Sequence, residues 1–572
     1  MRLSRSWLAV TLALAATLPL APVSTGAAAG PPPQSLPPGP LPLGPATLTE
    51  TRVEQQLAPG VTLTTITRGY NDTAREYWTI GVNIPVGPVK PDPDPTADQG
   101  AVGTLDKANA VAQQMLAAPS VAQEMANRGW QPRVEPVDYA PSFEGYAGGL
   151  IGYTLRVGRY AAKPAATDPL LVALTAAGFR AFTVYTGQDG RPDNTGPWVV
   201  RVLSVDPKRF AGRIRATVGD WVSGRETTTA MARKAGALYA MNGGFFTINP
   251  ADGTPGVPAG LSVVDGEVLT AATNGRYALV LGNDGRKTRF TALSSRYTVR
   301  FGPATHLVDA LNRVPGVVRN CGGTGGDAPT QRPVHDFTCT DPDELVVLTP
   351  EYGTAPAAGP GAEALVDPDG TVTAVRPRTG AAIPTGYRLV QATGADAAWL
   401  STHATVGGPM HLDLTVTDDA GQQVTFGPTD SVVNGGPRLV SNGQLAVNPV
   451  ADGLVHEDPT LGLPASALGA SFGYAWFIRD NPRSGVGVDA SGRLLFVQVD
   501  GRQDSYSQGL SIMAYAQVMK ALGAVEAVNL DGGGSSATVV NGQLVSSPSD
   551  LDAQGRPVER QNGDAIVLVP AG

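Results

Sequence analysis

The segment that constrains this chain most is VNLDGGGSSAT, residues 528–538, in which an apolar strand leads into one carboxylate and three consecutive glycines. Glycine has no Cβ, so the backbone of such a turn can adopt positive φ angles and approach a ligand closely. Successive N–H groups in this kind of turn form a concavity that suits an anion. The segment therefore predicts that Asp531 lies beside an oxyanion or phosphate site; the alternative is a tight hairpin turn with a capping Asp.

Two other segments have the same design, AMNGGFF (residues 240–246) and VNGGPRLV (residues 433–440). The Asn242 side chain offers both donor and acceptor atoms, and Phe245 could either stack on a sugar ring or fill the core. Turn chemistry alone poorly explains three Gly-Gly turns that each follow an Asn or Asp. We therefore expect these distant loops to converge on one pocket around Asp531.

The start of the chain predicts export. Residues 1–29 combine two arginines, an apolar run and a stretch of small residues, which is the pattern of a cleaved secretory signal. The proline-rich residues 30–46 should form an extended tether. No later stretch reaches the about 18 apolar residues that a membrane span needs. We expect a secreted, extracellular protein, with attachment to the cell wall left open.

Composition excludes one class of partner and favours a disulfide. The net charge of −8 argues against nucleic-acid binding, because neutralising phosphates needs a basic face. The two cysteines, Cys321 and Cys339, are predicted to form a disulfide in an oxidising compartment. A zinc site would need more ligands at suitable spacing, and only His335 lies nearby. No cofactor is identified from the sequence, and the metal requirement is left open.

The order of strand-like and helix-like segments predicts an α+β fold with few helices and a β-rich, mixed-sheet main domain. Residues 47–90 should supply its opening strands and residues 195–572 the rest, with helices near 227–237 and 511–522. Asp-Gly turns near 265 and 284 predict hairpins.

Residues 95–192 should form a small ferredoxin-like layer of two βαβ units, in which Pro119 divides the first helical stretch. Within this region, residues 152–187 resemble the sporulation-related repeat, SPOR, through an aromatic-ended basic strand and a leucine-bearing helix. The SPOR family binds peptidoglycan glycan strands, so the resemblance implies glycan binding. The alternative is a structural insertion with no ligand.

A second resemblance covers most of the rest of the chain, which is similar to the phosphodiester glycosidase family. The matching segments, in chain order, are AMNGGFF (240–246), PAGLSVVDGEV (258–268), ALNR (310–313), LVVLTPEYG (345–353), NGGPRLVSNG (434–443), NPRSGVGVDASGRLLFVQVDGR (481–502), SQGLSIMAYAQVMKALGAVEAVNLDGGGSSATVVNG (507–542) and VERQNGDAIVLV (558–569). Residues 55–69 also look like the opening strand of that family, which would make the SPOR-like unit an insertion within the catalytic domain.

This resemblance implies hydrolysis of a sugar-1-phosphodiester of the N-acetylglucosamine-1-phosphate type in a glycan or cell-envelope polymer. Asp531 would act as nucleophile, base or electrostatic stabiliser, while Asn242 and Asn529 would position the sugar or the phosphate. The remaining residues predicted to bind substrate oxygens or the sugar ring are Gly243, Gly244, Phe245, Gly532, Gly533, Gly534 and Ser535.

Arginines and further carboxylates complete the predicted site. Arg483 and Arg502 are candidate phosphate forks, because a guanidinium group binds phosphate through two hydrogen bonds. Additional charged residues on or near the matching segments, each with a structural alternative, are Arg313, Glu351, Asp500, Glu559 and Arg560.

Other enzyme classes fit less well. A serine hydrolase would show G-x-S-x-G, and GGSSA (533–537) lacks the last glycine. A P-loop motif is absent from the sequence. The remaining alternative is a non-catalytic protein that binds cell-wall glycan through the SPOR-like unit and the glycine loops.

Overall fold

The computed structural model describes residues 35–84, 100–139, 149–320, 338–353, 355–448, 452, 471 and 473–571. Contacts divide the chain into Met1–Leu36 and Pro37–Gly572, and the fold below is that of the second unit. It is an α+β fold in which strands predominate, as the sequence predicts. Within the described ranges the sheets are antiparallel except for one parallel strand pair, β16 with β19, so the sheet class is mixed.

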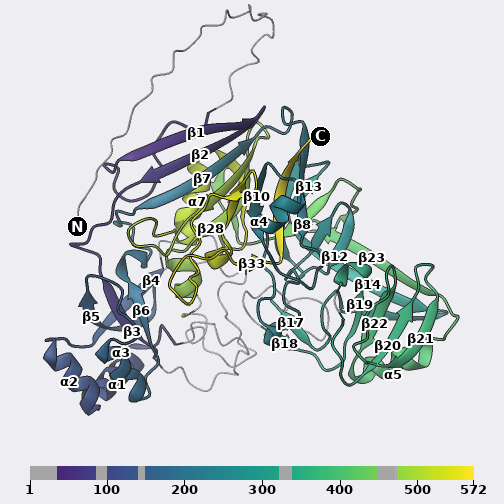
Figure 1. The fold of residues 1–572 in the computed structure, drawn as a ribbon, viewed down its shortest axis with the longest axis horizontal. Coiled ribbons are helices and arrows are strands. Elements are labelled where there is room, and N and C mark those ends of the chain that lie inside the picture. Colours follow the sequence, from purple (N-terminus) through teal and green to yellow (C-terminus); the bar gives the residue numbers. More distant parts are fainter. Residues whose placement is uncertain are drawn as a thin grey trace, which may run out of the picture. The chain divides into compact units, whose positions relative to one another are not determined.

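The main sheet contains eight strands in the order β1-β2-β7-β29-β28-β30-β26-β27, and each strand is antiparallel to its neighbours. Their bounds are β1 (Glu50–Ala58), β2 (Val61–Arg68), β7 (Trp198–Val205), β29 (Leu494–Val499), β28 (Arg483–Asp489), β30 (Ala524–Asn529), β26 (Arg438–Ser441) and β27 (Gln444–Leu445). The strand β2 pairs with β7 although more than a hundred residues separate the two in sequence, and β1 pairs with the other edge of β2 (Figure 1). The first and last parts of the chain therefore share one sheet.

The second sheet has the order β32-β31-β10-β34-β8. Its strands are β32 (Gln543–Leu544), β31 (Thr538–Val540), β10 (Tyr239–Asn242), β34 (Asp564–Pro570) and β8 (Gly212–Val218). Apolar side chains from this sheet, such as Met241 and Ile566, pack in one buried cluster with Phe496 and Val528 of the main sheet. This shared core fixes the ends of β10 and β30 relative to each other.

The third sheet follows the path β12-β11-β25-β13-β14-β23-β24, with β15 paired to β14. The strands are β11 (Ser262–Val264), β12 (Glu267–Thr270), β13 (Arg276–Gly282), β14 (Lys287–Phe301), β15 (Ala304–Val308), β23 (Met410–Asp418), β24 (Gln423–Val424) and β25 (Ser431–Asn434). The two predicted hairpins are confirmed: Asp265, with φ of 50°, joins β11 to β12, and Asp284, with φ of 56°, joins β13 to β14. Leu279 and Val433 carry this sheet into the shared core.

A fourth sheet with the order β16-β19-β22-β20-β21 packs with the helix α5 (Gly394–His403), which the sequence analysis does not assign. Its strands are β16 (Ala310–Leu311), β19 (Leu345–Leu348), β22 (Arg388–Ala392), β20 (Ala362–Val366) and β21 (Val372–Pro377). The small strand pairs are β9 (Glu226–Thr227) with β33 (Gln561–Asn562) and β17 (Val317–Arg319) with β18 (Thr338–Thr340). Short helical turns are η1 (Thr186–Gln188), η2 (Pro250–Asp252), η3 (Pro350–Tyr352), η5 (Gly473–Ile478) and η6 (Gly533–Ser535).

The inserted unit is a four-stranded antiparallel sheet in the order β4-β5-β3-β6 with its helices packed against it (Figure 1). Its elements are β3 (Trp78–Val82), α1 (Leu105–Ala117), α2 (Pro119–Asn127), β4 (Arg133–Tyr139), β5 (Gly149–Tyr160), α3 (Pro169–Ala176) and β6 (Ala181–Tyr185). This is the predicted ferredoxin-like arrangement, and α2 begins at Pro119 as predicted.

One strand lies in a different sheet from the one that the predicted domain limits imply. β3 falls within residues 47–90, but it pairs with β5 and β6 of the inserted sheet. The alternation of apolar residues identifies a strand without identifying its partner, so the sequence could not place β3. The inserted unit thus includes residues before position 95.

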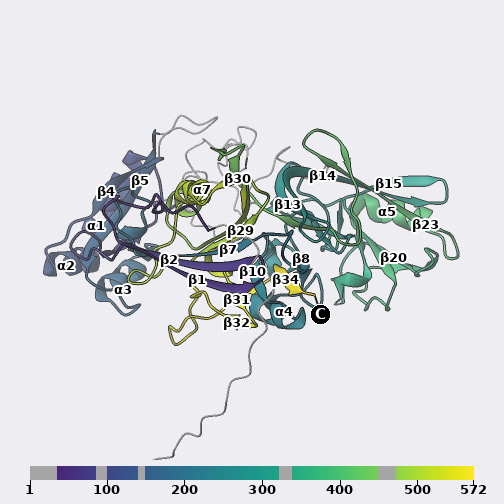
Figure 2. The same ribbon diagram turned by 90° about the horizontal axis from the view of Figure 1, so that it is seen from above.

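Both predicted helices of the C-terminal region are present. The helix α7 (Ile512–Ala521) begins after Ser511, whose hydroxyl accepts a hydrogen bond from the Ala514 N–H at 3.1 Å, and it packs against β30 (Figure 2). The shorter helix α4 (Thr228–Lys234) packs against β10. Among the described residues, none of the helices has the length and hydropathy needed to cross a bilayer.

Candidate active site

The two most informative glycine loops lie side by side. The Asn242 amide donates a hydrogen bond to the main-chain carbonyl of Asp531 at 2.8 Å. In return, the Asp531 N–H donates to the Gly243 carbonyl at 3.2 Å. Residues almost three hundred positions apart are therefore joined by reciprocal hydrogen bonds, as the convergence hypothesis requires.

The third glycine loop joins the same cluster. The Asn434 side chain forms two hydrogen bonds with the main chain of Phe245, accepting from its N–H and donating to its carbonyl, each at 3.1 Å. The Gly436 N–H donates to the Asn529 carbonyl at 2.8 Å. The loop at 434–436 is thereby connected to both of the other loops.

Sheet topology explains why these loops meet. Asn242, Asn434 and Asn529 are the last residues of β10, β25 and β30, which belong to the second, third and main sheets respectively. The three sheets share one core, so the C-terminal ends of these strands reach the same place. Ligands commonly bind where strand ends and their loops gather in this way.

The three asparagines hold the loops together. Asn242 and Asn529 are each only 1% exposed. The Asn242 carbonyl oxygen accepts from the Ser484 hydroxyl at 2.7 Å, and the Asn529 amide donates to the Gly436 carbonyl at 3.0 Å. Because the protein itself uses these amides, their place in this structure is behind the loops, where they orient Asp531 and its neighbours.

Asp531 is half-buried at the start of the three-glycine turn. One of its carboxylate oxygens accepts from the Gly532 N–H at 2.8 Å. The Gly533 N–H donates to the Pro482 carbonyl at 2.9 Å, and the Ser535 N–H donates to the Gly532 carbonyl at 3.1 Å. These N–H groups, predicted to bind substrate oxygens, are here used to hold the turn.

Two guanidinium groups lie against the turn instead. A Cβ placed on Gly533, whose φ is +59°, would be 3.1 Å from an Arg502 nitrogen, and a Cβ on Gly534 would collide with Arg560. Arg560 is fixed by two hydrogen bonds to Asp550, at 2.7 and 3.0 Å. Glycine is therefore required at Gly534 for close approach, and Arg502 places a positive charge beside the turn, whereas the charge of Arg560 is balanced by Asp550.

The other predicted phosphate fork, Arg483, has a different environment. It is 2% exposed, and its guanidinium donates to the carbonyls of Leu510 and Trp476 at 2.8 and 2.6 Å. Burial lowers the pKa of Arg483, opposed by nearby Asp480. In this structure Arg483 fastens the main chain around the site, next to Gly532.

A second carboxyl group at the site was missed by the sequence analysis. Asp564 opens β34, is 1% exposed, and lies so close to Gly243 that a Cβ there would be 2.5 Å from its carboxylate oxygen. The pKa of Asp564 is raised to about 7, mainly by burial; a hydrogen bond from the Gly244 N–H lowers the pKa, and the Asp531 charge adds to the rise. The available signal was the position of Asp564, directly after Asn-Gly in the segment QNGDAIVLV.

The remaining carboxylates singled out in the sequence have other partners. Asp500 is fully buried and pairs with Arg201 at 2.5 Å, and the Glu559 carboxylate accepts from the Thr229 N–H at 2.9 Å. Glu351 lies in η3, where its carbonyl accepts from the Val222 N–H at 2.9 Å.

The cysteine prediction is not decided by the structure. Cys339 is buried in β18, whereas Cys321 and His335 lie outside the described residues. The Cys321–Cys339 disulfide therefore stays a prediction.

Phe245 occupies the inner side of the first loop. It is 8% exposed, its ring centroid is 6.2 Å from that of Trp476, and the Arg276 guanidinium lies 5.3 Å from the ring. Of the two roles considered for Phe245, this environment is that of a core side chain.

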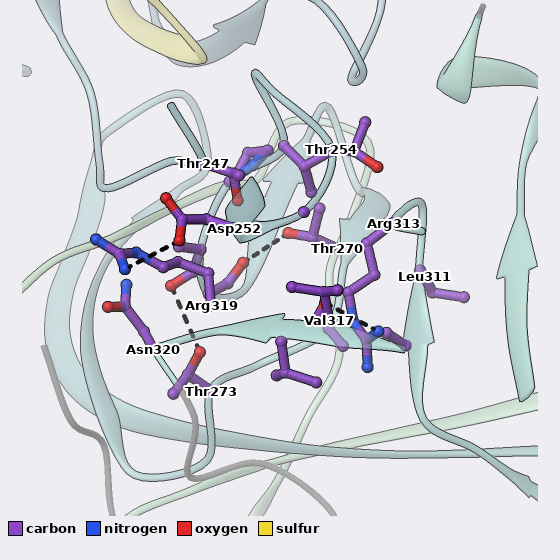
Figure 3. A pocket seen from close by; sticks show the side chains of 18 of the residues that line it. Thr247, Asp252, Thr254, Thr270, Thr273, Leu311, Arg313, Val317, Arg319 and Asn320 are labelled. Atoms are coloured by element: carbon purple, nitrogen blue, oxygen red, sulfur yellow. Dashed lines mark hydrogen bonds and ion pairs between the residues drawn. The ribbon is translucent and has the colours of Figure 1, made fainter. Parts of the chain in front are cut away.

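A separate small cavity of about 60 Å³ lies beyond this loop (Figure 3). It is lined by Arg313, which pairs with the buried Glu344, and by Arg319, which lies 3.6 Å from Asp252. The charges of both arginines are balanced by these carboxylates. Arg313 thus belongs to this cavity, and the site residues described above do not line it.

Metal ligation was also examined in the folded chain. Over the ranges that the structure describes, no group of three or more His, Cys, Asp or Glu side chains is arranged to hold a metal ion.

Comparison with known proteins identifies the family. Residues 360–569, which contain Asp531 and Asp564, match the phosphodiester glycosidase family. The match assigns this part of the chain to that family, and residues before position 360 lie outside it.

Three relatives show how far the similarity extends. A crystal structure from Burkholderia pseudomallei, of a protein described only as exported, is 34% identical with a TM-score of 0.80, covering 94% of this chain and 99% of its own. The N-acetylglucosamine-1-phosphodiester alpha-N-acetylglucosaminidase of Mus musculus is 41% identical over 68 residues, 12% of this chain and 13% of that enzyme. The Homo sapiens enzyme of the same name is 38% identical over 68 residues, with the same coverage of 12% and 13%. The chain thus spans about an eighth of the length of these curated relatives.

Proposed function

We propose that the protein is an exported hydrolase that cleaves a sugar-1-phosphodiester, with N-acetylglucosamine-1-phosphate linkages as the first candidates. The family of residues 360–569 and the printed name of the mouse and human relatives support this reaction class. Export is supported by the signal-like residues 1–29 and by the description of the Burkholderia relative.

The observation that carries the proposal is the pairing of two unlike carboxyl groups beside a positively charged turn. Asp531 is half-buried and held by a backbone N–H, whereas Asp564 is buried with a pKa raised to about 7. Enzymes that cleave glycosides commonly use two carboxyl groups with different pKa values, one as the acid and one as the base.

In this proposal Asp531 acts on the anomeric carbon, as nucleophile or as the base that deprotonates the attacking water. The C–O bond to phosphate breaks, the sugar gains the water hydroxyl, and the electron pair remains on the phosphate monoester. Asp564, protonated below pH about 7, keeps a second negative charge away from Asp531 and can supply a proton to the leaving oxygen.

Arg502 and Arg560 stabilise the leaving group. Both lie on the outer side of the glycine turn, where a phosphate could accept hydrogen bonds from planar guanidinium groups. A phosphate monoester is a better leaving group than an alcohol, so charge stabilisation by these arginines reduces the demand on the acid.

The test is release of free sugar from a methyl phosphodiester of N-acetylglucosamine-1-phosphate. We expect Asp531→Asn to lower kcat by roughly a thousandfold or more while the melting temperature is retained. Hydrolysis in ¹⁸O-water should place the label in the sugar. Label in the phosphate would contradict attack at carbon, and saturable glycan binding without turnover of varied diesters would favour the non-catalytic alternative.

A further inference from the structure

A large cavity lies between the inserted sheet and the loops of the main part of the chain. Its volume is about 670 Å³, more than ten times that of the cavity in Figure 3. The aromatic and cationic side chains that line it are Trp78, Lys163 and Tyr185 from the inserted unit and Arg479, Arg502 and Tyr506 from the main part.

Arg502 belongs to both the cavity and the candidate active site. This residue lines the cavity, and its guanidinium lies against Gly533 of the three-glycine turn. Arg502 has a φ of 60°, and its Nε donates to the Asn481 side chain at 3.0 Å, which fixes the direction of the guanidinium. A ligand bound by Arg502 at the turn would therefore lie next to the cavity.

The wall contributed by the inserted unit is an aromatic platform centred on Trp78. Its ring centroid lies 5.3 Å from that of Tyr185, and the Lys163 ammonium lies 5.5 Å from the Trp78 ring. The indole N–H donates to Asp504 at 2.8 Å, so the ring orientation is fixed across the cavity. Trp78 remains partly exposed, and such a ring suits the apolar face of a sugar.

The charge of the cavity favours an anionic ligand. Lys163, Arg479 and Arg502 are three cationic groups, and they outnumber the Asp504 carboxylate, which accepts a hydrogen bond from the Trp78 indole. Burial raises the pKa of Asp480 to about 7, so this lining carboxyl group is mainly neutral below that pH and does not cancel the cations.

We propose that this cavity binds the part of the substrate that lies beyond the cleaved bond, and that this part is an anionic glycan of more than one sugar unit. A sugar ring stacks on Trp78, and a phosphate or carboxylate group of the same chain is held by Lys163 and Arg479. The inserted unit thereby sets the length and charge of the preferred substrate. The assignment rests on the proposed function for the reaction, but ligand binding can be measured independently.

The experiment compares two substrates in the full-length protein. The short probe is the methyl phosphodiester of N-acetylglucosamine-1-phosphate, and the long probe is a trimer of N-acetylglucosamine joined by 1-phosphodiester bonds. We expect Trp78→Ala to lower the ratio of kcat/KM for the long over the short probe about tenfold, which corresponds to one lost stacking contact. Lys163→Gln should lower the same ratio about threefold, with the effect vanishing at high salt.

Two control variants match these changes outside the cavity. Trp221→Ala removes a tryptophan that is 47% exposed, and Lys107→Gln removes an exposed lysine on α1 of the inserted unit. Neither residue lines the cavity, so both should leave the ratio unchanged. An equal ratio in Trp78→Ala and the wild-type protein would overturn the proposal.

Calorimetric binding of the long probe separates this proposal from the proposed reaction. If the wild-type protein hydrolyses neither probe, the reaction is refuted, while binding that is weakened about tenfold by Trp78→Ala still supports the cavity. Undetectable binding of the long probe by wild-type protein overturns the cavity assignment. Equal competition by uncharged N-acetylglucosamine oligomers overturns the requirement for an anion.

Discussion

Asp531 and Asp564 show how one residue type acquires two states at a single site. Asp531 is half-buried at the start of the glycine turn, where its carboxylate accepts a hydrogen bond from the Gly532 N–H. Asp564 is buried beside Gly243 and near the Asp531 charge, and both effects favour its protonated form. The difference comes from position along the strands: Asp531 lies beyond the end of β30, whereas Asp564 lies inside the second sheet.

Asp564 should make folding stability depend on pH. Its pKa rises from an ordinary 3.8 to about 7 in the folded state, so the folded protein holds this proton more tightly than the unfolded chain does. The stabilising contribution is therefore complete below pH about 4 and is lost as pH rises through about 7.

We expect Asp564→Asn to remove that loss. The difference in free energy of unfolding between the variant and the wild type should therefore shift in favour of the variant by on the order of 1–3 kcal/mol from pH 5 to pH 8. Urea unfolding at the two pH values measures the difference, with Asp552→Asn on the surface as the control. If the difference in free energy of unfolding between Asp564→Asn and the wild type were the same at both pH values, the raised pKa would be contradicted.

For individual residues, the sequence predicted which residues belong to the candidate site better than it predicted what each side chain does there. Asp531 and its glycines stand out because their order is unusual, and Arg502 does lie against the turn. The burial of Arg483, Asn242 and Asn529 could not be predicted, because it depends on which carbonyls and hydroxyls of distant loops reach them. Asp564 was missed because one carboxylate in an apolar strand has no local signature.

The three-glycine turn is the element on which the site depends. Its last glycine is enclosed by the Arg560 and Asp550 side chains, which leave no room for a methyl group. The turn also holds Asp531 through the Gly532 N–H. Displacing the turn should therefore move the carboxylate and the guanidinium groups together.

We expect Gly534→Ala to lower kcat/KM for the short diester by roughly a hundredfold, because a displacement of about 1 Å at a site can cost that much. Gly39→Ala is the matched control: a Cβ at Gly39 meets nothing within 4 Å, and neither Gly39 nor Gly534 has a positive φ. Steady-state kinetics of the two variants measure the effect. Equal losses in both would show that collision with Arg560 and Asp550 is not the cause.

Elements with strong local signals were predicted correctly, such as α7 with its Ser511 cap and the hairpins at Asp265 and Asp284. Strand pairing was harder. The sequence of β3 is compatible with a strand in either sheet. Only the pairing of β5 and β6 with its two edges determines which sheet β3 joins. α5 has few buried residues, so its sequence shows no clear apolar face.

At the scale of the whole molecule, the inserted unit is attached to the main part by a buried polar contact. Arg156 of β5 forms two hydrogen bonds to Asp189, at 2.6 and 2.8 Å, and a third to the Tyr474 hydroxyl at 2.6 Å. Tyr474 belongs to η5, far away in sequence. Arg156 is only 5% exposed and the Asp189 side chain is 15% exposed, so removing Arg156 leaves a largely enclosed carboxylate without its cation.

We expect Arg156→Met to destabilise the attachment by roughly 3–5 kcal/mol. Limited proteolysis should then release a fragment cut beside the inserted unit faster than in wild type. Arg159→Met, on the exposed side of the same strand, is the control and should resist proteolysis as well as the wild type does. Resistance of Arg156→Met to proteolysis would show that other contacts hold the unit in place.

The overall organisation was predicted in class, as an α+β fold with a ferredoxin-like unit, because residue patterns identify layers. The order of strands within the two central sheets could not be predicted, since neighbours such as β7 and β29 are almost three hundred residues apart. The resemblance of residues 152–187 to SPOR stays a prediction.

The position of β34 has a consequence for how the chain matures. This strand, almost the last in the sequence, lies between β8 and β10, and it carries Asp564. Until β34 has been made, β8 and β10 each have an unsatisfied edge that can join another chain. The candidate site is therefore complete only after this strand has paired, and a chain truncated before residue 561 should accumulate as aggregates.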